Sequence, residues 1–229
     1  MSDSVVLVTG GAGNIGRTVT AAVLASGARV AVPLHKGDRP DALDALKAQY
    51  GQKLNFFALD LTTERGAKAA VDGTVEWAGR LDGVVHLVGA YAGGMRLDAT
   101  PVEVWDRMME VNVRSAFLVG RAALRQLLKQ GGGGALVFVS ARAAVEKPAQ
   151  MAAYAASKQA LLTMVEAMAA EYVEQRIRAN VLLPGTVDTQ ANRAAMPGAD
   201  PSQWTSPEMI AQTVVSLLDG DATAERVLL

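Results

Sequence analysis

Tyr154 and Lys158 are the two residues whose spacing most clearly suggests chemistry. They lie four residues apart at the start of a strongly helical stretch, so both side chains should project from one face of a helix. A phenol with an ordinary pKa of about 10 exchanges protons poorly at neutral pH, and an ammonium group one turn away should lower that pKa. The pair therefore predicts that Tyr154 donates and accepts a proton, assisted by Lys158.

A glycine-rich turn follows the first apolar run and opens a helical pattern, in Thr9-Gly10-Gly11-Ala12-Gly13-Asn14-Ile15-Gly16. Glycines allow the backbone to approach a pyrophosphate, and a helix N-terminus supplies N–H groups and partial positive charge. A purely structural turn is the alternative. The position of the turn directly after the first strand favours a dinucleotide site, for which we predict five residues: Gly10, Gly13, Asn14, Ile15 and Gly16.

The end of the second apolar run bears on the form of the dinucleotide. An acid there would bind the adenosine ribose hydroxyls, whereas a base would accept a 2′-phosphate. The segment following Leu34 begins with His35 and Lys36, with Arg39 close behind, and has no acid at the strand end. We therefore predict that His35 and Lys36 contact the cofactor and that NADP(H) is favoured over NAD(H). A solvated basic turn, or an approach of Asp38 to the ribose, is the alternative.

Asp60 follows the third apolar run, and Leu61 comes next. We predict that both contact the adenine, with the Asp60 carboxylate accepting from its amino group. The competing role for Asp60 is capping the helix that should begin near Thr62.

The elements that position these residues alternate along the whole chain. Apolar runs without strict alternation predict strands buried on both sides, and they are separated by helical patterns. The predicted strands are 4–9, 29–34, 54–59, 82–88, 135–140, 177–183 and, weakly, 226–229. The predicted helices are 14–26, 40–49, 63–78, 101–130, 151–175 and 206–219. We predict one α/β domain over 1–229, a Rossmann-like doubly wound parallel sheet, in which 131–134 ends a helix and 186–206 forms a substrate lid.

Composition narrows the classes of function. The 229 residues are half hydrophobic, and 22 basic residues balance 23 acidic ones, so no broad basic field exists for nucleic acid or an anionic membrane. Without cysteine there are no disulfides and no thiolate-bound metals, and we predict no metal site. The sequence also shows no export signal and no apolar run long enough to span a membrane, which predicts a cytoplasmic protein.

Taken together, these motifs resemble the short-chain dehydrogenase/reductase family over essentially the whole chain. The shared features are the turn at 9–16, Asp60, Asn112, Tyr154-Ala155-Ala156-Ser157-Lys158 and Pro184-Gly185-Thr186-Val187-Asp188-Thr189. The resemblance implies strand order 3-2-1-4-5-6-7 and an enzyme that transfers hydride between a nicotinamide cofactor and a small carbonyl or alcohol. It also implies that Tyr154 is the acid/base, Lys158 binds the nicotinamide ribose and Asn112 anchors a water of the proton relay. Further cofactor contacts are implied for Val88, Gly89, Ala90, Pro184, Gly185, Val187 and Thr189.

Two departures from the family pattern bear on function. The Asn-Asn-Ala-Gly segment of the family corresponds here to 86–89, which implies that polar bracing of the sheet is lost and that His86 is a packed core residue. The substrate-orienting serine falls on Ala141, whereas Ser140 lies one position earlier. Either an insertion before Tyr154 restores Ser140 to this catalytic role, or the serine is absent.

Segment 188–204 resembles dihydropteridine reductase, a member of the family that works without that serine. This keeps a second function open, the reduction of a quinonoid dihydropterin. A hypothesis of another class is a non-catalytic protein that senses NAD(P), although such proteins typically lose the tyrosine or the lysine that this chain keeps.

Apolar residues surround most of the two helical stretches 101–130 and 151–175. A helix that covers one face of a sheet needs only an apolar stripe of about 100°. We therefore predict a homo-oligomer, a tetramer or dimer, in which these helices pair with their symmetry mates. Coverage of both surfaces within one chain is the alternative.

Overall fold

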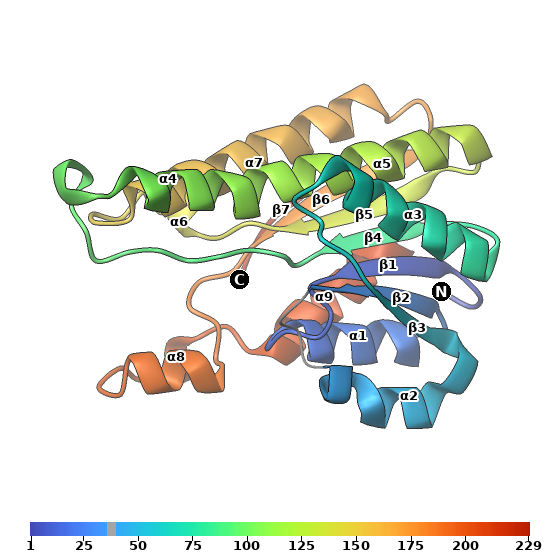
Figure 1. Cartoon of the computed structure of the whole chain (residues 1–229), viewed down its shortest axis with the longest axis horizontal. Coiled ribbons are helices and arrows are strands. Elements are labelled where there is room, and N and C mark those ends of the chain that lie inside the picture. The colour runs from blue at the N-terminus through green and yellow to red at the C-terminus, as the bar shows by residue number, and fades with distance from the viewer. Residues whose placement is uncertain (36–39) are drawn as a thin grey trace.

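The computed structural model describes residues 1–35 and 40–229, which form one α/β domain around a parallel sheet of seven strands (Figure 1). The strand order is β3-β2-β1-β4-β5-β6-β7, so the predicted fold class and order are confirmed. The strands are β1 (Val5–Thr9), β2 (Arg29–Leu34), β3 (Leu54–Ala58), β4 (Gly83–His86), β5 (Gly134–Val139), β6 (Ile177–Leu183) and β7 (Arg226–Leu228).

Helices cover both faces of the sheet. In the order of the chain, the helices are α1 (Gly16–Ala25), α2 (Asp44–Tyr50), α3 (Glu64–Ala78), α4 (Val102–Met108), α5 (Ser115–Gln130), α6 (Ala143–Glu146), α7 (Ala152–Glu171), α8 (Gln190–Ala195) and α9 (Pro207–Asp219). Helices α1, α2 and α9 lie on one face, and α3, α4, α5 and α7 lie on the other (Figure 1). The short helices α6 and α8 were not predicted from the sequence.

The helices on both faces of the sheet explain why the strands are apolar throughout, without alternation of apolar and polar residues. Successive side chains of a strand point to opposite faces. In β1, Leu7 packs in the core under α3, α5 and α7, whereas Val6 and Val8 pack in the core under α1 and α9. Both faces of the sheet are therefore buried under helices, as in other parallel sheets.

The predicted helix 101–130 is interrupted. Helix α4 leads into a π-helical segment, Met109–Arg114, which continues into α5. A π-helical segment widens the helix, and such segments occur often at functional sites. Here it carries Asn112. Helix α5 then ends as predicted, because Gly131 adopts a left-handed conformation with φ 70° that closes the helix.

The predicted lid is more regular than its sequence suggested. The short helix α8 lies within it, and an isolated β-bridge joins Val187 to Thr205. This bridge brings the two ends of the segment together beside the sheet. Elsewhere in the described chain, no helix combines the length and apolarity needed to cross a membrane.

Candidate active site

The predicted site residues follow the carboxyl ends of four neighbouring strands. Gly10 follows β1, Gly89 comes shortly after β4, Ser140 follows β5 and Pro184 follows β6. Carboxyl ends of parallel strands share one edge of the sheet, and ligands of open α/β sheets bind outside that edge. The first turns of α7 bring Tyr154 and Lys158 to the same edge, since Lys158 contacts the end of β5.

Lys158 is buried, with 5% of its surface exposed, and its Nζ donates to the carbonyl oxygen of Val139 at 3.1 Å. Burial lowers the pKa of Lys158 to about 8. Burial also raises the pKa of Tyr154 to about 12, with a further contribution from Tyr91. The expected lowering of the Tyr154 pKa is therefore wrong for the protein alone, because burial removes the phenol from water and disfavours its charged form.

Asn112 is fully buried, and its amide is held on both sides. Its Oδ1 accepts from the Ala90 N–H at 2.7 Å, and its Nδ2 donates to the Ala90 carbonyl at 3.0 Å. The same Nδ2 donates to Ser157 Oγ at 2.9 Å. Asn112 thus joins the π-helical segment to the loop after β4 and to α7. The sequence motif included Ser157 but gave it no role.

Ser140 is directed into the protein. Its Oγ donates to the carbonyl oxygen of Lys158 at 2.8 Å, and only 3% of the residue is exposed. The neighbouring residue Ala141, which matches the position of the family serine without an insertion, has no hydroxyl. The hydroxyl of Ser140 braces β5 against α7 in this structure.

The family resemblance implied that this chain lacks polar bracing of the sheet at 86–89. In the structure, His86 provides that bracing. Its ring lies between Thr9 Oγ1, 2.9 Å from Nδ1, and Ser115 Oγ, 3.3 Å from Nε2. Burial lowers the pKa of His86 to about 3, with a smaller contribution from the charge of Lys158. His86 is therefore a neutral core residue, as expected, but it links β1 to the first turn of α5.

The glycine-rich turn has the close contacts that require glycine. A Cβ on Gly16 would lie 2.0 Å from the Gly10 carbonyl oxygen, and one on Gly10, whose φ is 71°, would lie 3.1 Å from the Val88 nitrogen. The turn therefore packs against the backbone after β4. Helix α1 has no side chain capping its N-terminus at Ile15, and Gly13 and Asn14 are exposed beside it. This arrangement fits an anion at the helix N-terminus.

At the edge of the sheet that carries β2 and β3, Asp60 makes local bonds. Its Oδ1 accepts from both N and Oγ1 of Thr62, which lowers the pKa of Asp60, and Thr63 rather than Asp60 caps α3. Asp60 and His35 are exposed, whereas Leu61 is buried. Lys36, predicted to contact the cofactor, lies outside the described residues, as do Asp38 and Arg39.

After β6, the backbone is held in place by bonds to neighbouring segments. The Pro184 carbonyl accepts from Arg142 N, and Gly185 N donates to the Leu229 carbonyl. Val187 is buried in the bridge to Thr205, and Thr189 caps α8 through its hydroxyl. Pro184, Gly185, Val187 and Thr189 thus lie on the stretch of chain that leads from β6 into segment 186–206, the predicted lid.

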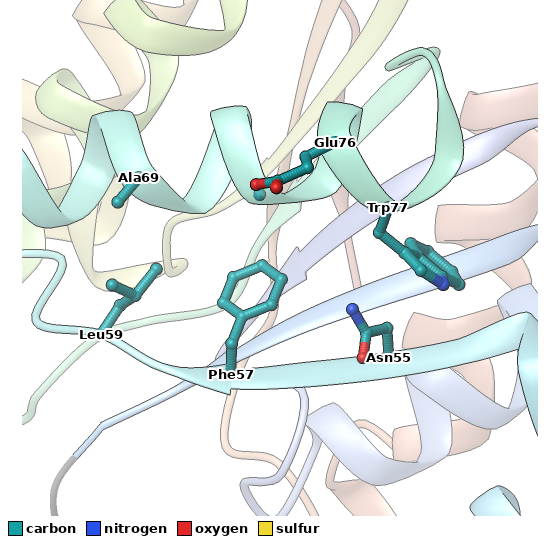
Figure 2. A pocket seen from close by; sticks show the side chains of 7 residues that line it. Asn55, Phe57, Leu59, Ala69, Glu76 and Trp77 are labelled. Carbon is teal, nitrogen blue, oxygen red and sulfur yellow. The ribbon is translucent and has the colours of Figure 1, made fainter.

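A separate open groove of 380 Å³ lies between β3 and α3 (Figure 2). Its walls include Phe57 and Trp77, and none of the predicted site residues lines it. It is therefore distinct from the cluster around Tyr154.

Comparisons with known proteins agree with this geometry. Residues 4–199 match the sequence model of a family described as short chain dehydrogenase. The chain is 32% identical to 2-(S)-hydroxypropyl-CoM dehydrogenase 3 of Xanthobacter autotrophicus, over 97% of this chain and 92% of the relative. A short-chain type dehydrogenase/reductase from Mycobacterium ulcerans superposes with a TM-score of 0.92 at 28% identity, covering 100% of this chain and 89% of the other. An NAD⁺-bound xylitol dehydrogenase superposes with a TM-score of 0.86 at 25% identity, covering 100% and 98%.

Proposed function

Because the chain belongs to the short-chain dehydrogenase/reductase family, we propose that it is an NADP(H)-preferring oxidoreductase acting on a small carbonyl or alcohol. One observation carries this proposal: Tyr154 and Lys158 lie on the same face of α7. Asn112 holds the loop after β4 beside them. These residues adjoin a glycine-rich turn whose contacts suit a dinucleotide.

The described residues fit the nicotinamide cofactor that the family implies. Gly10, Gly13, Asn14, Ile15 and Gly16 would hold its pyrophosphate at the N-terminus of α1. On one side of this turn, His35, Asp60 and Leu61 would contact the adenosine. Lys36, which lies outside the described residues, is proposed to join them only from its place in the sequence after β2. On the other, Val88, Gly89 and Ala90 would line the central part of the cofactor, and Pro184, Gly185, Val187 and Thr189 would contact the nicotinamide. A Cβ at Gly89 would lie 3.0 Å from Lys158 Nζ and 3.1 Å from Asn112 Oδ1, so a larger residue there would crowd both groups.

The preference for NADP(H) rests on charge at the end of β2. No acidic residue stands there to repel a 2′-phosphate, and Lys36 and Arg39 follow in the sequence. The NAD⁺-bound relative shows that the fold also accepts NAD⁺. Fluorescence titration of the protein with NADPH and NADH tests the preference: tighter NADPH binding, weakened selectively by Lys36→Glu, supports it, and tighter NADH binding contradicts it.

The cofactor, when bound, supplies or accepts hydride. Tyr154, as a neutral phenol, gives its proton to the substrate oxygen during reduction and accepts one during oxidation. Lys158 would also bind the nicotinamide ribose. Asn112 holds the loop at Ala90 and would anchor the water through which protons reach the pair.

The inward orientation of Ser140 and the alanine at 141 favour one specific alternative substrate, a quinonoid dihydropterin, whose transition state needs less support for an oxyanion than that of a ketone. The non-catalytic sensor of NAD(P) is a further hypothesis, but the protein keeps both Tyr154 and Lys158.

The deciding experiment is oxidation of NADPH and NADH, followed by absorbance, with ketones, quinones, 3-oxoacyl thioesters and quinonoid dihydropterin. Turnover of a ketone or quinone supports the main proposal, and turnover of the dihydropterin alone supports the alternative. Cofactor binding without turnover of any substrate would favour the sensor.

We further propose that the protein assembles as a homodimer or homotetramer. Several large apolar side chains on α4 and α5 remain at the surface of the chain, although Leu161, Leu162 and Val165 of α7 are buried within it. The exposed side chains are Val102, Trp105, Phe117 and Leu128. An isologous contact between copies would cover them.

A further inference from the structure

Two hydroxyl groups near Tyr154 already donate hydrogen bonds to backbone carbonyls of α7. Ser140 Oγ donates to the carbonyl of Lys158 at 2.8 Å, and Ser157 Oγ donates to the carbonyl of Tyr154 at 2.8 Å. Both serines are buried. With Ala141 beside them, none of these three residues can donate a side-chain hydrogen bond to an oxygen that approaches Tyr154.

Tyr91 is different, because its ring contacts that of Tyr154. The two ring centroids are 5.1 Å apart at an interplanar angle of 73°, an edge-to-face arrangement. Tyr91 is 63% exposed, on the loop that follows β4, at the edge of the sheet where the site residues gather. Among residues 1–35 and 40–229, no group accepts a hydrogen bond from its hydroxyl.

The loop sequence makes room for this phenol. A Cβ on Gly93 would lie 2.3 Å from Tyr91 Oη and 2.8 Å from Cζ, so no other residue type leaves Tyr91 where it is. The same Cβ would lie 3.3 Å from Cγ of Met151, which comes just before α7. The Tyr91 ring therefore lies between the backbone at Gly93 and the ring of Tyr154.

We propose that Tyr91 donates the second hydrogen bond to the substrate oxygen, in the place of the serine that this chain lacks; this inference rests on the carbonyl reduction proposed above. During reduction, a hydride that bound NADPH would supply from one of its own C–H bonds forms the new C–H bond at the carbonyl carbon, and the cofactor would be left as NADP⁺. The C=O π pair moves to oxygen, and Tyr154 transfers its proton to that oxygen. Tyr91 stabilises the developing negative charge through its O–H and keeps its proton.

The catalytic test uses NADPH-dependent reduction of two diketones, butane-2,3-dione and the planar phenanthrene-9,10-quinone. Tyr91→Phe should lower kcat by about 10-fold or more, because it removes one donor to the oxyanion. The KM for NADPH should stay the same. Adding Ala141→Ser to Tyr91→Phe should restore much of the loss, since it returns a hydroxyl to the family position. Tyr172→Phe, at the far end of α7, is the matched control.

A second measurement needs neither cofactor nor substrate. Alkaline titration of the phenols, followed by ultraviolet absorbance, should show that Tyr91→Phe lowers the pKa of Tyr154 from about 12, because the charge of Tyr91 contributes to that value. Gly93→Ala, which displaces the Tyr91 hydroxyl, should reduce kcat as Tyr91→Phe does.

The outcomes separate the two proposals. Wild-type turnover by Tyr91→Phe, from an enzyme that reduces either diketone, overturns the role of Tyr91 and leaves the proposed function intact. If the wild type reduces neither diketone nor any compound of the wider screen, the proposed function fails. In that case the alkaline titration still tests the inference about Tyr91. An unchanged Tyr154 pKa in the Tyr91→Phe variant would overturn the placement of the two phenols side by side.

Discussion

At the scale of single residues, burial sets the protonation states of the proposed reactive pair, Tyr154 and Lys158. Lys158 has a pKa of about 8 and stays mostly charged at neutral pH, whereas Tyr154, with a pKa of about 12, stays neutral. A neutral phenol beside an ammonium group is prepared to donate a proton. The protein alone is therefore in the state that carbonyl reduction requires.

We expect Tyr154→Phe to lower kcat by about 100-fold or more while the Kd for NADPH stays nearly constant, because the change removes proton transfer and little binding surface. Steady-state kinetics together with fluorescence titration measure both quantities. Near-normal turnover would contradict the assignment of Tyr154.

For Ser140, the bond to the Lys158 carbonyl predicts a structural effect. Ser140→Ala should leave kcat within a few-fold of wild type and lower the free energy of unfolding by about 1 kcal/mol. Kinetics and urea denaturation of the same preparation separate the two effects. If kcat instead falls by about 10-fold or more, Ser140 orients the substrate.

At the scale of elements, the glycine-rich turn and the loop after β4 hold each other in place. Gly16→Ala should abolish tight NADPH binding, because its Cβ would lie 2.0 Å from the Gly10 carbonyl oxygen. Fluorescence titration measures the Kd. Gly132→Ala is the control, since a Cβ at Gly132 meets open space. Equal affinity of both variants would argue against a role for the turn.

His86 links β1 to α5, and its depressed pKa makes this link sensitive to acid. The unfolded chain binds a proton at His86 below pH 6.5, whereas the native protein keeps His86 neutral down to about pH 3. Unfolding therefore takes up a proton in this window, and the free energy of unfolding should fall as pH decreases, by at most about 1.4 kcal/mol per pH unit.

Urea denaturation at several pH values between about 6.5 and 4 checks this expectation. His86→Asn should remove most of the slope, because the asparagine does not titrate. The same substitution at exposed His35, which leaves the buried imidazole of His86 in place, is the matched control. Identical slopes in wild type and His86→Asn would show that other groups dominate the acid sensitivity.

At the scale of the whole molecule, part of the exposed apolar surface lies on α4 and α5, the helices on either side of the π-helical segment that carries Asn112. Phe117, with 46% of its surface exposed, lies on α5, which continues from the π-helical segment around Asn112. Contact between copies at α5 would therefore also stabilise the segment that positions Asn112.

Size-exclusion chromatography with light scattering at micromolar concentration should give a mass at least twice the 23.9 kDa of one chain. Phe117→Glu should shift the mass toward the monomer, because it places a charge in the predicted contact. Met209→Glu, at a residue of similar exposure (49%) on α9 across the sheet, is the control and should keep the wild-type mass. A wild-type monomer would refute the proposed assembly.

The sequence by itself predicted the strands and the positions of Tyr154, Lys158 and Gly10, because apolar runs, helical spacing and glycine in tight turns follow local rules. The order of the strands came from the resemblance to the family, not from these local rules. Tertiary contacts decided the rest. The Ser140 hydroxyl points to Lys158, His86 replaces the family bracing, and the Tyr154 pKa rises, since each depends on side chains distant in sequence. The pairing of Tyr91 with Tyr154 likewise exists only where the loop after β4 meets α7.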